Sequence, residues 1–224
     1  MRDWLRLAVE TARKDLLLEL RAKRTLFLST VFAMLVVVVF AFAFGRSLGT
    51  RPAVGRGALW IAFVFAGVVS VTRSAAVETA DAAIEGLLLA PADRTAVYFG
   101  KVASNALFVF GVEVASLGFV YVFLQYTPPA SALPWLALTF AVAAVGFAAA
   151  GTLLALLAAR SRLPELTLPV VLVPILVPIL LGGVQLTRAF TGDARAGPWL
   201  QVLLAYDGIL LLVGMVLFEP VVEG

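Results

Sequence analysis

The sequence predicts an all-α integral membrane protein made of one transmembrane domain with six transmembrane helices. Of its 224 residues, 62% are hydrophobic and only 14% are charged, and the mean hydropathy is +1.03. A soluble protein carries charge on roughly a quarter of its residues. The apolar residues also come in blocks, and a helix needs ~20 of them to cross the hydrocarbon layer.

The chain begins with an amphipathic helix at residues 3–24, within an N-terminal segment of residues 1–25. Its charged side chains resemble those of a helix lying among lipid headgroups. Asp15 and Glu19 interrupt the apolar face, so packing against a protein partner is as well supported as lying on the bilayer. The apolar face comprises Trp4, Leu5, Ala8, Val9, Ala12, Leu16 and Leu20. The candidate interfacial residues are Arg13, Lys14, Asp15, Glu19 and Arg21.

Six apolar spans follow this helix. The second is short for a membrane crossing unless its helix continues past Arg73. In the fourth, Gly151, Ala155 and Ala159 are spaced by four, which lets another helix approach closely. We place the spans near residues 26–44, 57–72, 102–124, 133–158, 166–186 and 199–218.

The fifth span contains Pro169, Pro174 and Pro178. Each proline removes a hydrogen bond from the helix, so this span is predicted to be kinked or partly unwound. A bent structural helix and a moving gate both fit the pattern.

The distribution of positive charge predicts that both termini are cytoplasmic. With that orientation, twelve of the 17 Lys and Arg residues lie on the cytoplasmic side. Cytoplasmic loops carry such an excess in most membrane proteins. Trp60, Trp135 and Trp199 each begin an inward-running span, as an outer belt of aromatic residues would.

The long polar loop Arg73–Lys101 is predicted to hold a cytoplasmic coupling helix between the second and third spans. Within it, Glu78, Asp81 and Glu85 lie on one side of a helix that runs from about Ser74 to Ala90 and ends by Pro91. Asp93 then caps the next helix. The acidic stripe fits contact with a separate protein, and equally well neutralisation of the basic N-terminal helix.

Several kinds of chemistry are missing from the sequence. Without histidine or cysteine, the chain has no imidazole or thiolate to bind a metal and no Ser/His or Cys/His nucleophile. It also has no phosphate-binding loop, since Gly100-Lys101 lacks the first glycine and the final hydroxyl of that motif. Any ATP that drives this protein is therefore hydrolysed by another chain.

Two acidic residues lie near the middle of apolar spans, Glu113 in the third and Asp207 in the sixth. A charge at that depth is costly, so such residues face the interior of a bundle. They either line a pocket for substrate or partner, or form hydrogen bonds between helices.

Three stretches together resemble the CcmB family, the permease subunits of the cytochrome c maturation (haem exporter) ABC complex, which have an ABC-2-type membrane fold. They are RKDLLLELRAKRTL, Arg13–Leu26; IEGLLLAPADRTAVYFGK, from Ile84; and LLAYDGILLLVGMVLFEPVVEG, Leu203–Gly224. The resemblance implies that Arg13–Arg24 of the N-terminal helix and Glu78–Pro91 contact an ATPase subunit. The closest motif matches are Glu85, Gly86, Leu87, Leu88 and Leu89.

The resemblance also implies the partners: a CcmA-like ATP-binding subunit, CcmC-like and CcmD-like membrane subunits, a CcmE-like haem chaperone and a second copy of this chain. ATP hydrolysis on the partner would then drive haem delivery or release of haem-loaded chaperone in the bacterial inner membrane. This chain would bind no cofactor, metal or nucleic acid and would catalyse no reaction itself. A permease that exports a lipid, drug or polysaccharide is the alternative of the same class. An ion-driven channel or secondary transporter that uses Glu113 and Asp207 is the alternative of another class.

Overall fold

The computed structural model describes residues 2–21, 24–44, 51–80, 93–159, 164–190 and 195–223, and this part of the chain is almost entirely helical. Its seven α-helices are α1 (Arg2–Arg21), α2 (Arg24–Phe44), α3 (Arg51–Ala80), α5 (Arg94–Leu124), α6 (Leu133–Ala159), α7 (Pro164–Ala189) and α8 (Ala196–Glu223). A short 3₁₀ helix, Ala130–Ala132, precedes α6.

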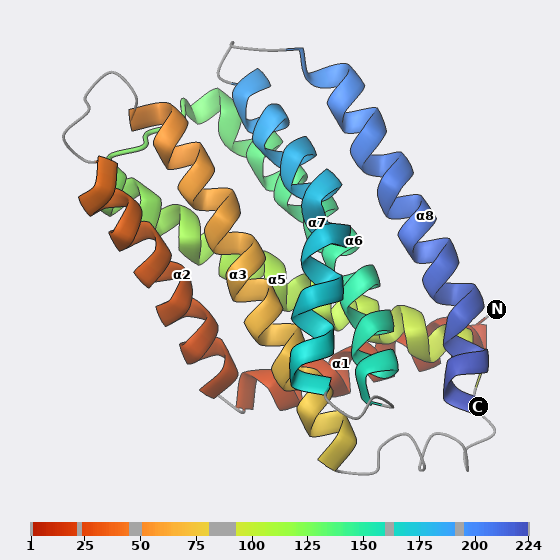
Figure 1. Ribbon diagram of the computed structural model, residues 1–224. Coiled ribbons are helices and arrows are strands. Elements are labelled where there is room, and N and C mark those ends of the chain that lie inside the picture. The colour runs from red at the N-terminus through yellow and green to blue at the C-terminus, as the bar shows by residue number, and fades with distance from the viewer. Residues whose placement is uncertain are drawn as a thin grey trace.

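Six of these helices form a bundle, and α1 crosses one end of it (Figure 1). Both ends of the chain lie at the end that α1 crosses. The helices α3 and α6 run in the same direction, because Trp60 lies against Phe140 and Val71 lies against Gly151.

Five of the helices are long and apolar enough to cross a membrane, so the chain is a multi-pass membrane protein. They match five of the six predicted spans. The helix α3 continues past Arg73 to Ala80, but its apolar part, Ala53–Val69, is only a short stretch of its 30 residues. Much of α3 is enclosed by other helices, and Ala58–Val64 is buried except for the half-buried Ile61. A helix shielded in this way does not need the hydropathy of one that faces lipid.

The small residues of α6 do let other helices approach closely, as predicted. In its apolar stretch 78% is buried, against 17–39% in the other four long apolar helices. A Cβ added at Gly151 would lie 2.8 Å from the side chain of Val71 in α3. The helix α6 is therefore the central helix of the bundle, packed against α3, α5, α7 and α8.

The predicted position of Trp60 in an outer aromatic belt is wrong. Its side chain is fully buried, and its indole N–H donates to the Thr187 hydroxyl at 3.0 Å. It fits because Gly183 of α7 has no side chain, and a Cβ there would overlap the indole ring. With Phe63, Phe140 and Phe147 it forms the aromatic core of the bundle, with ring centroids 5.4–5.8 Å apart.

The other two tryptophans of the predicted belt are more accessible than Trp60. Trp135 is 51% exposed and stacks on Phe190, and Trp199 is half-buried.

The sequence predicted that the proline-rich helix α7 is kinked or partly unwound. It is not unwound, because α7 remains helical through Pro169, Pro174 and Pro178. Its axis changes direction near the middle (Figure 1). The carbonyl of Ile175, which lies between Pro174 and Pro178, accepts a hydrogen bond of 2.7 Å from the Tyr206 hydroxyl of α8. A neighbouring helix thus supplies a hydrogen bond within the stretch that the prolines weaken.

Candidate coupling site at the end of the bundle

The candidate site lies at the end of the bundle crossed by α1, where α5 begins directly after the predicted coupling segment. The Asp93 carboxylate caps α5, accepting from the backbone N–H of Thr95 at 3.0 Å and of Ala96 at 3.4 Å. The Thr95 hydroxyl donates to the same oxygen at 2.7 Å. The Thr95 hydroxyl and the two amides hold the pKa of Asp93 below its ordinary value. The predicted helix cap is confirmed.

Most of the predicted coupling helix lies outside the described residues. Glu78 belongs to the last turn of α3, so the helix predicted after Ser74 is present as far as Ala80, in one piece with the second apolar stretch. The predicted contact residues outside the described part are Asp81, Glu85, Gly86, Leu87, Leu88, Leu89 and Pro91.

The N-terminal helix α1 packs against the first turns of α5. The indole N–H of Trp4 donates to the Thr95 hydroxyl at 2.9 Å, and the Trp4 ring meets Phe99 edge-on at 5.7 Å. Gly100 permits the approach, because a Cβ there would lie 2.7 Å from the Ala8 carbonyl oxygen and from Thr11 Cβ. The sequence left open packing against a protein partner and lying on the bilayer, and the packing observed is with α5 of the same chain.

The charges of α1 divide between the packed and the exposed side. Asp15 is mostly buried and lies 3.4 Å from the Lys101 ammonium group of α5 and 3.1 Å from that of Lys14. Glu19 is half-buried, whereas Arg13, Lys14 and Arg21 are exposed. The acids that interrupt the apolar face thus lie on the packed side, and the basic residues point outward.

The exposed side of α1 also carries apolar residues. Leu5, Val9 and Leu20 are 48–63% exposed and lie along one edge of the helix, between the packed side and the basic side. This edge suits a helix at the level of the membrane surface.

The two acids within the membrane helices are buried on different helices. Glu113 is fully buried in α5 and Asp207 is 4% exposed in α8. Among the described residues, none forms a hydrogen bond with either carboxyl group. Asp207 lies against Gly146 of α6 so closely that a Cβ there would overlap its carboxyl group. Both lie inside the bundle, as the sequence predicted, on two different helices.

The chemistry available at the candidate site is that of binding. In the described part, no three acidic side chains gather where they could hold a metal ion. Among the described residues, the hydrogen bond from Trp4 to Thr95, the ion pair of Asp15 with Lys101 and the close approach at Gly100 hold α1 and α5 in a fixed arrangement.

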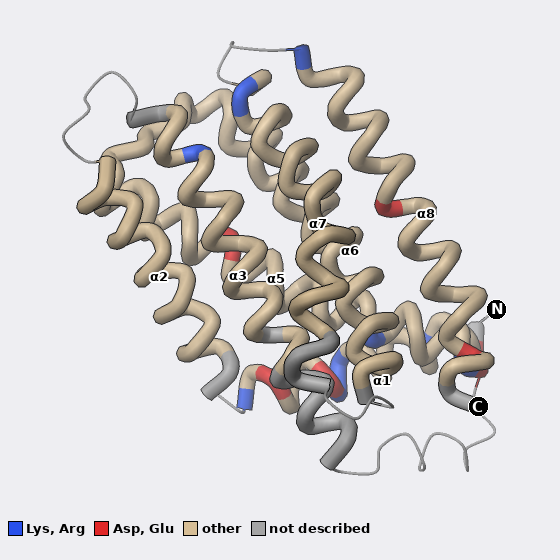
Figure 2. The backbone as a smooth tube through the Cα atoms, in the orientation of Figure 1, with Lys and Arg blue, Asp and Glu red and all other residues tan. Residues whose placement is uncertain are grey.

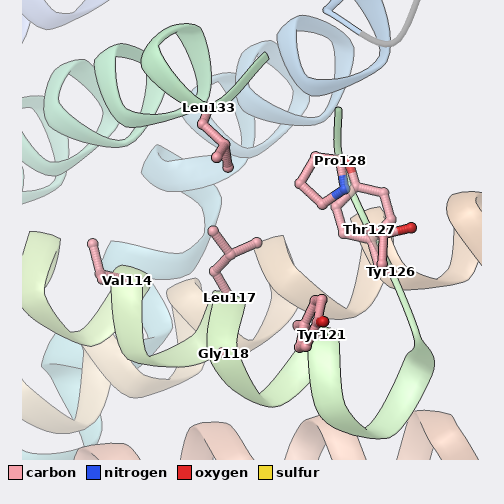
Figure 3. A pocket seen from close by; sticks show the side chains of 8 residues that line it. All are labelled: Val114, Leu117, Gly118, Tyr121, Tyr126, Thr127, Pro128 and Leu133. Atoms are coloured by element: carbon pink, nitrogen blue, oxygen red, sulfur yellow. The ribbon is translucent and has the colours of Figure 1, made fainter. Parts of the chain in front are cut away.

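A pocket that the sequence did not predict lies at the opposite end of the bundle, where α5 ends and α6 begins (Figure 3). Its volume is about 400 Å³ and its surface is mostly apolar. It is lined by Val114, Leu117, Gly118, Tyr121, Tyr126, Thr127, Pro128 and Leu133. Gly118 has no side chain and so leaves space in this surface. A single glycine in a sequence, however, does not distinguish a pocket from a smooth helix surface.

Sequence reasoning also missed the roles of Thr95, Gly100 and Lys101 in holding α1. In the sequence, Gly100-Lys101 stands out only as an incomplete phosphate-binding motif and as the end of a stretch that resembles the CcmB family. The acidic Asp15 and the basic Lys101 are 86 positions apart, and no local pattern connects residues so distant.

Comparison with known proteins identifies the family. The model of the CcmB protein family matches residues 6–220. Two curated relatives are both called heme exporter protein B. The protein from Paracoccus denitrificans is 28% identical over 188 residues, which cover 83% of each chain. The protein from Rhodobacter capsulatus is 26% identical over 175 residues, which cover 78% of this chain and 79% of the relative. The resemblance found in the three stretches is thus confirmed over nearly the whole sequence, and the chain belongs to the CcmB family.

Proposed function

We propose that this chain is the membrane subunit of an ABC transporter complex that exports haem for cytochrome c maturation. The observation that carries the proposal is the CcmB match over residues 6–220, supported by two relatives named as haem exporters. A CcmA-like partner hydrolyses ATP, and this chain has no catalytic role. The hydrolysis drives haem delivery by releasing the haem-loaded CcmE-like chaperone, with CcmC-like and CcmD-like subunits in the same complex.

The chain crosses the bacterial inner membrane six times, with α3 as the second span. The parallel course of α3 and α6 supports this, because a helix that follows α6 from Trp60 to Val71 traverses the same depth. Both termini are then cytoplasmic, and α1 lies at the cytoplasmic surface of the bundle. A second copy of the chain completes the membrane part of the complex.

The ATPase subunit binds α1 and the start of α5 at the end of the bundle that α1 crosses, together with the segment 81–92 that precedes α5 in the sequence. Figure 2 shows charged residues of both signs gathered at this end. The basic residues of α1 point outward there, as a surface for an acidic partner requires. The acidic residues Glu78, Asp81 and Glu85 contribute the opposite charge.

Charge reversal tests this function. Changing Glu78, Asp81 and Glu85 together to lysine is expected to reduce the ATPase that co-purifies with this chain by about tenfold. Three surface ion pairs at about 0.5 kcal/mol each amount to that factor. The amount of this chain in the membrane should not change, because these side chains belong to a polar segment outside the apolar spans.

Arg195→Glu is the control, since Arg195 is exposed and lies next to the start of α8, at the opposite end of the bundle. It should leave co-purification of the ATPase unchanged. If the triple variant also retains the full amount of ATPase, the proposed binding surface is wrong.

A further inference from the structure

We propose that the first turns of α5 join α1 and the end of α8 into one rigid unit, called here the junction. It comprises α1, Arg94–Lys101 of α5 and Gly214–Val221 of α8, the last two each about two helical turns. The contacts between these three helices are the evidence that the unit exists. That the unit transmits motion from an ATPase rests on the proposed function.

The contact between α1 and α5 leaves little freedom for sliding. Trp4 is fixed at one end by its hydrogen bond to Thr95, and Asp15 is fixed further along by Lys101. Between them, Gly100 lies directly against the backbone and side chains of α1. Two polar anchors separated by a backbone contact define both the position and the rotation of α1.

The opposite side of the same turns of α5 packs against α8. The Tyr98 ring is fully buried and lies 5.4 Å from that of Phe218. Gly214 makes room for it, since a Cβ there would overlap the Tyr98 hydroxyl. Arg94 and Glu219 approach to 3.7 Å, but Glu219 is exposed, so this ion pair adds little.

One apolar cluster connects the three parts of the junction. Val97 and Tyr98 of α5 and Phe218 of α8 are buried in it, and Leu7 of α1 and Val221 of α8 pack against it. The cluster also contains Ala148, Ala149 and Leu156 of α6, so it packs the junction against the central helix, whereas Trp60 and Phe63 belong to the main core. Close-packed side chains transmit displacement instead of absorbing it. The three parts of the junction therefore move together.

The position of the junction gives it a mechanical role. The segment 81–92 leads directly into α5, so a protein that displaces this segment displaces the junction. The helix α8 then carries the displacement into the membrane. At mid-length it meets α7 through the hydrogen bond from Tyr206 to Ile175, and α6 through Asp207 and Gly146. The route from the partner to the proline-rich helix thus runs through α5 and α8.

Distance measurements between spin labels test the junction, and the absence of cysteine from the chain makes site-specific labelling direct. Labels on V9C and V216C report on α1 and α8, both at exposed positions. In the full chain in lipid nanodiscs we expect a narrow distribution of this distance. Gly100→Ala and Gly214→Ala should each broaden and shift it. Gly111→Ala is the matched control, because no atom lies within 4 Å of an added Cβ there.

Phe218→Ala provides a second test that adds no bulk, and it should also broaden the distribution. A wide distribution in the unmodified background, or one that none of Gly100→Ala, Gly214→Ala and Phe218→Ala alters, would overturn the junction.

The assembled complex tests transmission. A third label on F42C, which is 88% exposed at the far end of α2, serves as the reference. Addition of nucleotide to the complex with its ATPase should change the distance from V9C to F42C and leave that from V9C to V216C unchanged. Equal changes in both distances would overturn the proposal. Failure of the ATPase to bind would count against the proposed function, whereas the glycine variants would still decide whether the junction exists.

Discussion

The aromatic core of the bundle and the junction at its end are held together by different means. In the core, large rings fill spaces that glycines leave open, as Trp60 does at Gly183 and Phe147 does at Gly67. In the junction, polar anchors such as Trp4 to Thr95 and Asp15 to Lys101 fix the packing of α1. The core contacts lie deep in the bundle, and the junction contacts lie where the helices end.

This difference follows from the surroundings of each region. Lipid tails are as apolar as a helix interface, so within the membrane helices associate through close packing. A polar contact suits the end of the bundle, where its donors and acceptors are not confined to hydrocarbon. The core should therefore respond mainly to changes in shape, and the junction both to changes in shape and to loss of its polar anchors.

Loss of Trp60 is expected to have the largest effect on stability. Trp60→Ala should lower the free energy of unfolding by about 3 kcal/mol, the lower end of the range for such a truncation. The lower end applies because only packing and one hydrogen bond are lost, not transfer from water. Reversible unfolding in mixed detergent micelles measures this.

The matched control is Trp135→Ala, which removes an indole ring that is 51% exposed. Its effect should be well under half of that of Trp60→Ala. Equal losses from the two variants would mean that the core is not held by the fit of its rings.

The contrast between Trp60 and Trp135 also shows what the sequence predicts and what it does not. Both begin an apolar stretch, and both were predicted to lie in an aromatic belt. Hydropathy locates an apolar helix along the chain because burial in lipid and burial in protein need the same residues. For the same reason it does not say which side of the helix faces protein. The position of Trp60 depends on Gly183 and Thr187, more than 120 residues away.

Prediction of the candidate site from the sequence has the same limit, because local patterns can be recognised and contacts between distant residues cannot. The Asp93 cap was predictable because a cap depends on residues within three positions of it. The amphipathic pattern of residues 3–24 likewise predicted α1. Its packing against α5 was not predictable, because Trp4 and Thr95 are 91 positions apart. Local patterns thus gave the helices, whereas the junction depends on contacts between them.

The second prediction concerns the contact of Asp207 of α8 with Gly146 of α6, where a polar group lies in a closely packed interface. Gly146→Ala should destabilise the protein by about 1–3 kcal/mol, because the added methyl group overlaps the Asp207 carboxyl group in a packed interface. Asp207→Ala removes the group that is overlapped. The double variant should therefore be more stable than the sum of the two single effects predicts.

Unfolding free energies of the two single variants and the double variant measure this coupling. Gly111→Ala, which meets open space, is the control for replacing a helical glycine with alanine. Strictly additive effects of Gly146→Ala and Asp207→Ala would show that the two residues do not share one packed contact.

The smallest expected effect belongs to the junction and depends on pH. The Thr95 hydroxyl and two backbone amides lower the pKa of Asp93 from its ordinary value of 3.8 in the folded chain. The unfolded state therefore binds this proton more readily. The stabilisation is fully present above the ordinary pKa and is lost as the pH falls through the lowered pKa of the folded state. Asp93 is exposed, so solvent screens the effect and it should stay below about 1 kcal/mol.

The measurement is the free energy of unfolding between neutral pH and the acid limit of the folded protein, for the unmodified chain, Asp93→Asn and Asp93→Ala. Asparagine caps a helix about as well as aspartate but does not titrate. Asp93→Asn should keep the stability at neutral pH and lose part of the acid dependence, because other carboxyl groups still titrate. Asp93→Ala should lose stability at neutral pH. An acid dependence that is identical in the unmodified chain and in Asp93→Asn would show that the cap does not depend on the charge of Asp93. The hydrogen-bonding geometry alone would then hold the start of α5 in the junction.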